Sequence, residues 1–263
     1  MSKRILCIGD IHGGFKALVQ VIERAQVTSN DTIIFLGDYV DGWGESFELI
    51  EYLIALSETH RCIFIQGNHD VWMNQWLTDG VVPVIGPYVT WRDRGGNSTL
   101  KSYMERPPSD IEPHRIFFRR LHHFYEDHAN RVYLHAGYTQ GGGVRFENPM
   151  RNLWWDRGMF EMAYLHQKRH GDNPQLYKEM YPTILKTYYE IYVGHTSTQH
   201  WDTLQPIQAC NVINLDTGGG HLNGRLTIMD VDSKEYWQSD KLKDLYPDDP
   251  HCEFMKNEGS HLN

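Results

Sequence analysis

The sequence predicts an α/β protein whose first strands form a parallel sheet, and two observations carry this prediction. In the first 80 residues, short apolar runs alternate with segments whose apolar residues recur at helical spacing, which is the rhythm of repeated β-α-β units. Each short run stops at a glycine, as a buried strand that enters a turn commonly does. Apolar runs late in the chain, separated by Gly-rich turns, predict a second sheet.

The elements of the first region follow in regular order. The predicted strands cover residues 3–8, 31–36 and 61–66, closed by Gly9, Gly37 and Gly67. The predicted helices cover residues 15–25, 47–56 and 71–77. Right-handed crossovers between parallel strands bring the three carboxyl ends to one edge of the sheet, where open α/β sheets bind ligands.

The pattern after residue 80 is less regular. Residues 80–130 are rich in proline, and we expect loops and helices that form a cap, or insert, over the site. Residues 148–186 are predicted to be helical, with interruptions at Pro174 and Pro182. Further strands are predicted at 131–134, 190–193, 211–215, 226–231 and 235–238, the last three belonging to the second sheet.

The chain is predicted to be a single domain over residues 1–240, followed by a C-terminal tail over residues 241–263. A length of 263 residues also fits two small domains, but no repeat or low-complexity block divides it. A hydrophobic content of 40% is sufficient for a packed core. The tail has little periodicity, and we expect it to be mobile.

Composition argues against several classes of partner. The net charge of −9 does not suit a general nucleic-acid binder. No apolar run approaches the ~20 residues that span a bilayer, and the N-terminus lacks a signal-peptide profile. Three of the four cysteines lie in hydrophobic runs, where a reduced cysteine packs as a small apolar group. We therefore expect a cytoplasmic protein without a membrane partner.

Five short polar clusters close five apolar runs. They are Gly9-Asp10-Ile11-His12-Gly13, Gly37-Asp38-Tyr39-Val40-Asp41-Gly42, Gly67-Asn68-His69-Asp70, His135-Ala136-Gly137 and Gly194-His195-Thr196. Hard oxygen ligands mixed with imidazole suit a pair of divalent metal ions better than a structural zinc, which favours thiolates. Since a two-metal site is suited to phosphoester hydrolysis, the clusters predict that chemistry.

Taken together, the clusters resemble the metal-dependent phosphoprotein phosphatases, the PPP-type calcineurin-like metallophosphoesterases. The family pattern is GDxHG, GDxVDRG, GNHE, HAG and GHT, and this chain has GDIHG, GDYVDG, GNHD, HAG and GHT. Residues 91–100 and 215–218 are similar to the bacterial and phage branch, which also contains the symmetrical diadenosine tetraphosphatases. The resemblance implies a four-layer αββα sandwich of two mixed β-sheets, with the metals at the edge between them.

The resemblance also implies a metal-binding role for six residues at strand ends. They are Asp10, His12, Asp38, Asn68, His135 and His195. Asp10 and His12 would bind the first ion, and Asp38 would bridge it to the second. Asn68, His135 and His195 would complete the ligands of the second ion. A bridging carboxylate is reasonable because two adjacent dications repel each other and need a shared anion. Manganese is the expected metal, and iron or zinc are alternatives.

The same resemblance implies the catalytic roles. His69 would protonate the leaving oxygen as general acid, and Asp41 would orient its imidazole. A hydroxide bridging the two metals would attack phosphorus in line, so no covalent enzyme intermediate is expected.

The chain departs from the family pattern in its phosphate-binding arginines. Gly42 stands where GDxVDRG has arginine, and we hypothesise that Arg94 or Arg92 supplies the lost guanidinium from another loop. The alternative is that both are ordinary solvated charges. Arg157 matches the family's second phosphate arginine in its distance beyond His135.

The leading functional hypothesis is a phosphomonoester hydrolase, of the serine/threonine phosphoprotein phosphatase type, acting on a phosphoprotein or a small phosphoester. Asp41 favours it, because the tetraphosphatase branch usually carries alanine at that position. The lost arginine weakens the monoester's phosphate clamp, so the alternative is a dinucleoside polyphosphate hydrolase of the diadenosine tetraphosphate type. A third reading is a non-catalytic scaffold of the same fold, which should have lost ligands or the general acid.

Overall fold

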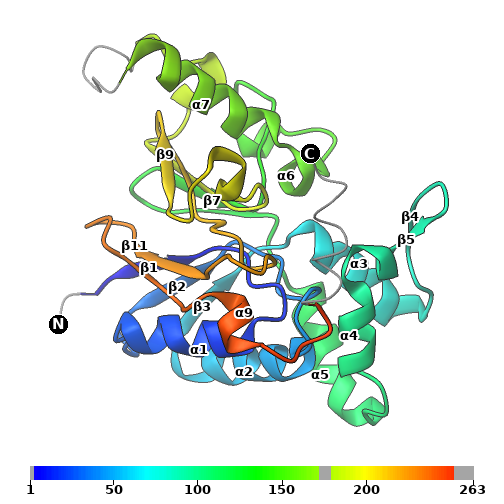
Figure 1. Cartoon of the computed structure of the whole chain (residues 1–263). Helices are drawn as coiled ribbons and strands as arrows, with labels where there is room; N and C mark the ends of the chain where they lie inside the picture. Colours follow the sequence, from blue (N-terminus) through cyan, green and yellow to red (C-terminus); the bar gives the residue numbers. More distant parts are fainter. Residues whose placement is uncertain (1–2, 172–178, 252–263) are drawn as a thin grey trace.

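The computed structural model describes residues 3–171 and 179–251, and within them two sheets face each other with helices on their outer faces (Figure 1). The strands are β1 (Ile5–Ile8), β2 (Thr32–Phe35), β3 (Arg61–Phe64), β4 (Val84–Gly86), β5 (Val89–Thr90), β6 (Phe124–Glu126), β7 (Arg131–Leu134), β8 (Glu190–Val193), β9 (Ile207–Ala209), β10 (Val212–Asn214), β11 (Thr227–Asp230) and β12 (Tyr236–Gln238). The α-helices are α1 (Phe15–Arg24), α2 (Ser46–Thr59), α3 (Asn68–Asp79), α4 (Gly96–Ser102), α5 (Pro108–Arg119), α6 (Asn152–Trp155), α7 (Gly158–His170) and α9 (Leu242–Leu245). The 3₁₀ turns are η1 (Trp91–Arg94), η2 (Val144–Phe146), η3 (Thr183–Lys186) and η4 (Thr198–Trp201).

The first sheet has the order β12-β11-β1-β2-β3. Strands β1, β2 and β3 are parallel, as the β-α-β rhythm predicts. Strand β11 pairs antiparallel with β1, and β12 pairs antiparallel with β11. The prediction that residues 226–231 and 235–238 belong to a second sheet is therefore wrong. These strands return to the first sheet, where they cover the edge that β1 would otherwise expose.

The second sheet has the order β6-β7-β8-β10-β9. Its three central strands are parallel, so their carboxyl ends lie at one edge, as in the first sheet. Strand β10 lies within the stretch 211–215 that was predicted for this sheet. The predicted helical stretch 148–186 contains α6, α7 and η3, while Pro174 lies outside the described residues.

Buried apolar side chains from both sheets fill the space between them. Cys7, Ile34 and Ile63 of the first sheet pack there with Tyr133 and Tyr192 of the second. The two tyrosine rings stack with centroids 4.9 Å apart. Helices α1 and α2 cover the outer face of the first sheet and α7 that of the second (Figure 1). The expected four-layer αββα sandwich of two mixed sheets is confirmed.

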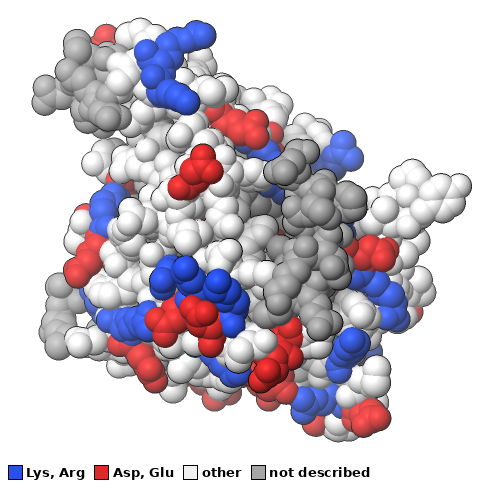
Figure 2. Space-filling view, viewed as in Figure 1, with Lys and Arg blue, Asp and Glu red and all other residues white. Residues whose placement is uncertain are grey.

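The insert over residues 80–130 is built from a hairpin, β4 with β5, followed by η1, α4 and α5. Helix α4 packs against α2, and α5 packs against α3. The hairpin projects from the body, and Figure 2 shows it as a protrusion without charged side chains. On the rest of that face, acidic and basic side chains are interspersed, and no broad basic patch is seen.

The segment after Lys241 is not a mobile tail throughout, which corrects the sequence prediction. Helix α9 is followed by Tyr246, whose ring stacks on the buried Trp43 with centroids 5.1 Å apart. His251 contacts the same indole edge-on at 4.8 Å. This aromatic packing holds the chain against the body as far as residue 251, and residues 252–263 lie outside the described part.

Within residues 3–171 and 179–251, every helix is too short or too polar to cross a lipid bilayer.

Candidate metal centre

The carboxyl ends of strands from both sheets meet at a cavity of about 1140 Å³. The first sheet lines it with His12, Asp38, Asn68 and His69, and the loop after β8 adds His195. Three of these residues, His12, Asp38 and His195, have a φ in the left-handed region, between 51° and 68°. Non-glycine residues held there cost of order 1–3 kcal/mol each and often cluster at functional sites.

Asp70 holds the loop that carries Asp38. Its Oδ2 accepts the backbone N–H groups of Asp38 and Gly67, both at 2.8 Å, and its Oδ1 accepts that of Tyr39 at 3.0 Å. Asp70 is completely buried, so these bonds are shielded from water. Sequence reasoning assigned no role to Asp70. Its position three residues after Gly67, at the start of a helix, is the local signal that could have identified a capping carboxylate.

Four ligand-type side chains converge at the seam of the two sheets. The Nε2 atom of His135 lies 3.0 Å from Asn68 Oδ1, 3.1 Å from His195 Nδ1 and 3.4 Å from Asp38 Oδ2. All four residues are buried. The sequence predicted these residues as ligands of one ion, and the fold does bring them together.

The hydrogen bonding of His135 shows that this cluster fits a cation. Its Nδ1 donates to the Leu36 carbonyl at 2.9 Å, so in the neutral imidazole Nε2 presents a lone pair. That lone pair faces Asn68 Oδ1 and the carboxylate of Asp38, which are also acceptors. Several buried acceptors directed at one point are unfavourable unless a cation lies between them, and oxygen with imidazole donors suits a divalent transition metal.

A second group of potential ligands shares Asp38. It contains His12 and His69, whose Nε2 atoms lie 3.7 Å and 4.0 Å from Asp38 Oδ2. Asp38 therefore belongs to both groups, which is the arrangement expected of a bridging ligand. The group includes His69, which the sequence assigned to proton transfer, and not Asp10.

Asp10 is buried at the same seam, where its carboxylate accepts the backbone N–H of His195 at 3.0 Å and 3.2 Å. Burial, together with the negative charges of Asp216 and Asp38, raises the pKa of Asp10 well above its ordinary value. A concentration of buried carboxylates that raises a pKa in this way is relieved when a cation binds.

The imidazoles and Asp38 influence one another's protonation. Burial by itself would raise the pKa of Asp38, but His135 and His69 outweigh it and hold that pKa well below the ordinary value. Burial and the neighbouring His69 lower the pKa of His12 to about 3. Burial and the nearby His135 lower the pKa of His195 well below its ordinary value. Neutral His12 and His195 beside a charged Asp38 are protonation states that metal binding requires.

His69 and Asp41 form a hydrogen-bonded pair at the mouth of the site. The His69 Nδ1 atom lies 2.6 Å from Asp41 Oδ2. Burial lowers the pKa of His69, but the carboxylates of Asp38 and Asp41 outweigh it and raise the pKa to about 9. The fold thus brings together the two residues that the sequence selected for proton transfer.

The three candidate phosphate-binding arginines lie in different settings. Arg157 lines the cavity, and its guanidinium donates to the His195 carbonyl at 3.2 Å and to Thr196 Oγ1 at 3.1 Å. Arg94 also lines the cavity, from an exposed position at the end of η1. Arg92 does not line it, and donates instead to Asn97 Oδ1 at 3.2 Å.

The C-terminal segment forms part of the cavity wall, which sequence reasoning did not anticipate. His251 lines the cavity near Gly42, and its Nε2 lies 2.9 Å from the Gly220 carbonyl. Since Gly42 occupies the position of the arginine that the family pattern has, this wall is aromatic where a guanidinium was expected. The packing of residue 251 against residue 43 depends on the tertiary fold and left no local signal.

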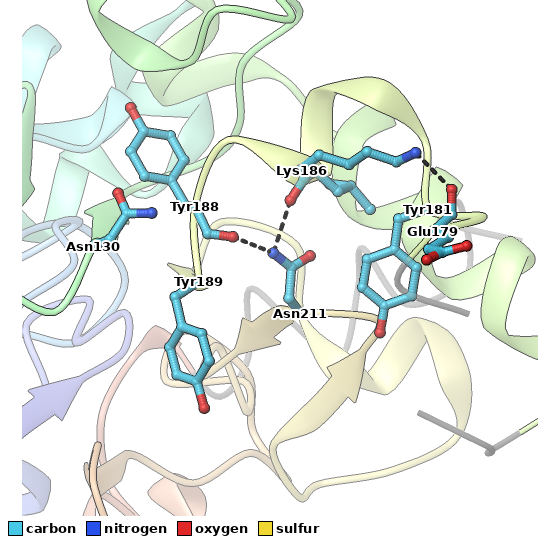
Figure 3. Close-up of a pocket in the computed structure, with 8 residues that line it drawn as sticks. Asn130, Glu179, Tyr181, Lys186, Tyr188, Tyr189 and Asn211 are labelled. Atoms are coloured by element: carbon cyan, nitrogen blue, oxygen red, sulfur yellow. Dashed lines mark hydrogen bonds between the residues drawn. The ribbon is translucent and has the colours of Figure 1, made fainter. Parts of the chain in front are cut away.

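A second cavity, of about 550 Å³, lies at the opposite edge of the second sheet, near the amino ends of β7, β8 and β10 (Figure 3). Asn211 is hydrogen-bonded there, since its Nδ2 donates to the Leu185 and Tyr188 carbonyls at 2.8 Å and 2.9 Å. These bonds join the turn η3 to the start of β10. Asn211 therefore has a structural role, at the strand ends opposite to those that carry His135 and His195.

A family model described as calcineurin-like phosphoesterase matches residues 3–196, and the chain belongs to this family. The match includes all five strand-end clusters.

Curated relatives match over part of their length. The symmetrical bis(5'-nucleosyl)-tetraphosphatase of Buchnera aphidicola is 25% identical over 132 residues, covering 49% of this chain and 42% of the relative. A PP2A-like serine/threonine-protein phosphatase of Candida albicans is 33% identical over 72 residues, covering 27% of this chain and 17% of the relative. The chain thus spans less than half the length of either relative.

Solved structures support the fold. A serine/threonine phosphatase from Saccharomyces cerevisiae superposes with a TM-score of 0.54 at 15% identity, covering 90% of this chain and 80% of that one. A cold-active protein-tyrosine phosphatase of a psychrophilic Shewanella gives 0.53 at 14% identity, covering 91% and 81%. At these identities the similarity concerns the fold alone.

Proposed function

We propose that this protein is a dinuclear-metal phosphomonoester hydrolase of the serine/threonine phosphoprotein phosphatase type. The observation that carries the proposal is the His69–Asp41 pair, whose 2.6 Å contact lies beside the two candidate ligand groups that share Asp38. A proton donor placed next to a metal centre is needed when the leaving group is a poor one, such as an alkoxide from serine or threonine.

The proposed ligand assignment follows the convergence of the side chains. Asn68, His135 and His195 would hold one ion, Asp38 would bridge, and His12 with Asp10 would hold the other. When bound, two divalent ions would supply Lewis acidity that activates water and stabilises the phosphoryl oxygens. We propose manganese, with iron or zinc as alternatives, since mixed oxygen and imidazole ligands suit all three.

The remaining steps belong to side chains of the chain itself. Arg157 would bind phosphate oxygens, because its guanidinium is already oriented at the cavity wall by His195 and Thr196. Arg94, which also lines the cavity, would add a second contact. His69 would donate the proton on its Nε2 to the leaving oxygen as the phosphorus–oxygen bond breaks, with Asp41 holding Nδ1.

Hydrolysis of dinucleoside polyphosphates is the second candidate, favoured by the tetraphosphatase relative. The size of the cavity, about 1140 Å³, leaves room for more than a phosphate group. We further propose a cytoplasmic location, which the three free cysteines among the described residues support.

A side-by-side assay tests the proposal. The protein loaded with Mn²⁺ is given p-nitrophenyl phosphate, a phosphoserine peptide and diadenosine tetraphosphate at equal concentrations. We expect release of inorganic phosphate from the first two. Turnover of the dinucleotide alone would favour the second candidate, and the absence of any turnover by the metal-loaded protein would leave only the scaffold reading.

A further inference from the structure

The stretch Trp91 to Leu100 is similar to the bacterial and phage branch in sequence, yet the proposed chemistry uses only one of its side chains, that of Arg94. It forms η1 and α4, which lie in the insert over residues 80–130. Two of its side chains, Trp91 and Thr99, are completely buried and therefore do not contact a substrate in the open cavity. Their contacts point to another role.

Both side chains donate a hydrogen bond to the carboxylate of Asp41. The Trp91 indole N–H donates to Oδ2 at 2.5 Å, and the Thr99 hydroxyl donates to Oδ1 at 2.6 Å. Oδ2 is also the oxygen that contacts His69 Nδ1, at 2.6 Å. Each oxygen of this buried carboxylate is thus fixed by the insert, and one of them faces the imidazole.

The hydroxyl proton of Thr99 has one good hydrogen-bond acceptor, the carboxylate of Asp41. Its hydroxyl oxygen accepts the backbone N–H of Asp41 at 2.9 Å, so the hydroxyl proton is left for Asp41 Oδ1. Ser46 Oγ lies 3.2 Å from the same hydroxyl oxygen and must then act as donor. The Thr99 hydroxyl therefore bridges the backbone N–H and the carboxylate of Asp41. Asp41 itself has a φ of +74°, in the left-handed region.

Two glycines allow the insert to approach this closely. A Cβ at Gly96 would lie 2.6 Å from the Trp91 ring, and a Cβ at Gly95 would lie 2.9 Å from the Gly42 backbone nitrogen. Gly95 also has φ of +91°, which side-chain-bearing residues rarely adopt. The glycine pair of this stretch is explained by the packing of η1 and α4 against the loop that carries Asp41.

We propose that Trp91 and Thr99 are positioning residues that orient Asp41, and through it His69, for protonation of the leaving oxygen. This inference rests on the proposed function, since it concerns the step in which His69 acts. It makes the insert a part of the proton-transfer apparatus as well as a cap over the cavity. A carboxylate that accepted only the His69 hydrogen bond could rotate about its side-chain torsions and release the imidazole.

The test compares substrates that differ in their need for a proton. A p-nitrophenolate ion leaves without protonation, whereas the alkoxide of a phosphoserine peptide does not. In Thr99→Val and Trp91→Phe, we expect kcat/KM to fall about 10- to 100-fold on the peptide, a typical range for loss of an orienting partner, and to change little on p-nitrophenyl phosphate. Thr99→Ser should keep the wild-type ratio between the two substrates. Trp76→Phe, in a tryptophan that packs 6.0 Å from Trp91, is the matched control.

A second readout does not depend on activity. In metal-free protein labelled with ¹⁵N-histidine, the Nδ1–H proton of His69 should give a downfield resonance, because its hydrogen bond is short and charged. That resonance should persist in Thr99→Ser and Trp76→Phe, and shift or broaden in Thr99→Val and Trp91→Phe. If Trp91→Phe does not fold, Thr99→Val, which keeps the shape of the side chain, decides the outcome.

The possible failures are distinguishable. If the wild-type protein hydrolyses no phosphomonoester, the proposed function fails, and the histidine resonance still tests the contact. If the wild-type protein is active and both variants lose activity equally on the two substrates, the role is general stability and the inference is overturned. Variants that retain the wild-type ratio and an unchanged resonance would overturn it as well.

Discussion

The two sheets supply different atoms to the candidate metal centre and hold them in different ways. The first sheet provides the oxygens of Asp38 and Asn68, and its own Asp70 fixes the Asp38 loop through three backbone N–H groups. The first sheet also adds the imidazole of His12, whereas the ligand-type residues that the second sheet adds to the two groups are the imidazoles of His135 and His195.

Both second-sheet histidines are held by groups of the first sheet. His135 donates to the carbonyl of Leu36, and the backbone N–H of His195 donates to the Asp10 carboxylate. The first sheet therefore acts as the template, and the second-sheet histidines take their positions when the sheets pack together. It follows that a bound metal should stabilise the contact between the sheets as well as the site.

Removal of the metals should give the largest effect on stability. Ligand that binds the folded state alone at 1,000 times its dissociation constant adds about 4 kcal/mol, which corresponds to a rise in Tm of roughly 10 °C for a domain of this size. Chelator-treated and Mn²⁺-loaded protein can be compared by differential scanning calorimetry. Equal Tm values, with metal content confirmed by elemental analysis, would show that the sheets are not coupled through the site.

Asp38→Asn should remove the carboxylate of the first sheet that both ligand groups share. Since Asp38 belongs to both ligand groups, we expect loss of both ions and a fall in kcat/KM of more than about 100-fold, the upper range for outer-shell partners alone. His195→Gln, on the second sheet, should lose one ion. Elemental analysis of the two purified variants checks the difference, and two retained ions in Asp38→Asn would contradict the bridging role.

The two arginines that line the cavity, Arg157 and Arg94, allow the same kind of comparison for the binding of the substrate phosphate. Arg157→Ala should lower kcat/KM about 30-fold or more, because a hydrogen bond to a charged group contributes about 2–3 kcal/mol. Arg94→Ala should lower it only a few-fold. Both arginines are exposed, but only the Arg157 guanidinium is held at the cavity wall, by the His195 carbonyl and Thr196 Oγ1. Arg92→Ala is the control, as Arg92 does not line the cavity. A larger loss in Arg94→Ala than in Arg157→Ala would reverse the assignment.

A stability change at the far end of the first sheet should leave the site intact. Asp31, at the amino end of β2, accepts hydrogen bonds from Arg4 at 2.7 Å and 3.1 Å. Burial would raise its pKa, but the bonds from Arg4 and Thr28 outweigh it and lower the pKa from 3.8 to about 2. This difference corresponds to about 2 kcal/mol of stability at neutral pH.

Because the pKa of Asp31 is depressed in the folded state, that contribution is fully present above about pH 4 and is lost as the pH falls toward 2. Asp31→Asn should therefore be about 2 kcal/mol less stable than wild type in urea at pH 7, and the gap should narrow below pH 4. The metal content per folded molecule should not change. A loss of metal in this variant would mean that the site responds to any weakening of the first sheet.

The sequence predicted correctly those features that depend on residues near one another in the chain, such as a strand and the polar residues that follow it. Residues 5–8, 32–35 and 61–64 alternate with α1 and α2 as the apolar spacing predicts, because burial of one face dictates that spacing. Asp10, Asp38 and Asn68 follow these strands directly, so their meeting at one sheet edge is a consequence of parallel topology.

The predictions from the sequence were wrong where the position of a segment depends on residues that are distant in the chain. Strands β11 and β12 have the same apolar composition as strands of a second sheet, and only their pairing with β1 shows where they belong. The segment after Lys241 has little periodicity of its own, since its order comes from the contact of Tyr246 with Trp43.

The amino-acid sequence by itself determined the types of ligand, their order along the chain and the strands that carry them. The tertiary structure alone decided the orientation of the side chains in the site. The Leu36 carbonyl accepts a hydrogen bond from His135, and Trp91 and Thr99 donate hydrogen bonds to Asp41. The reason is physical. The chemical type of a side chain depends only on the residue at that position. Its orientation depends on hydrogen bonds with residues that become neighbours only when the sheets and the insert pack together.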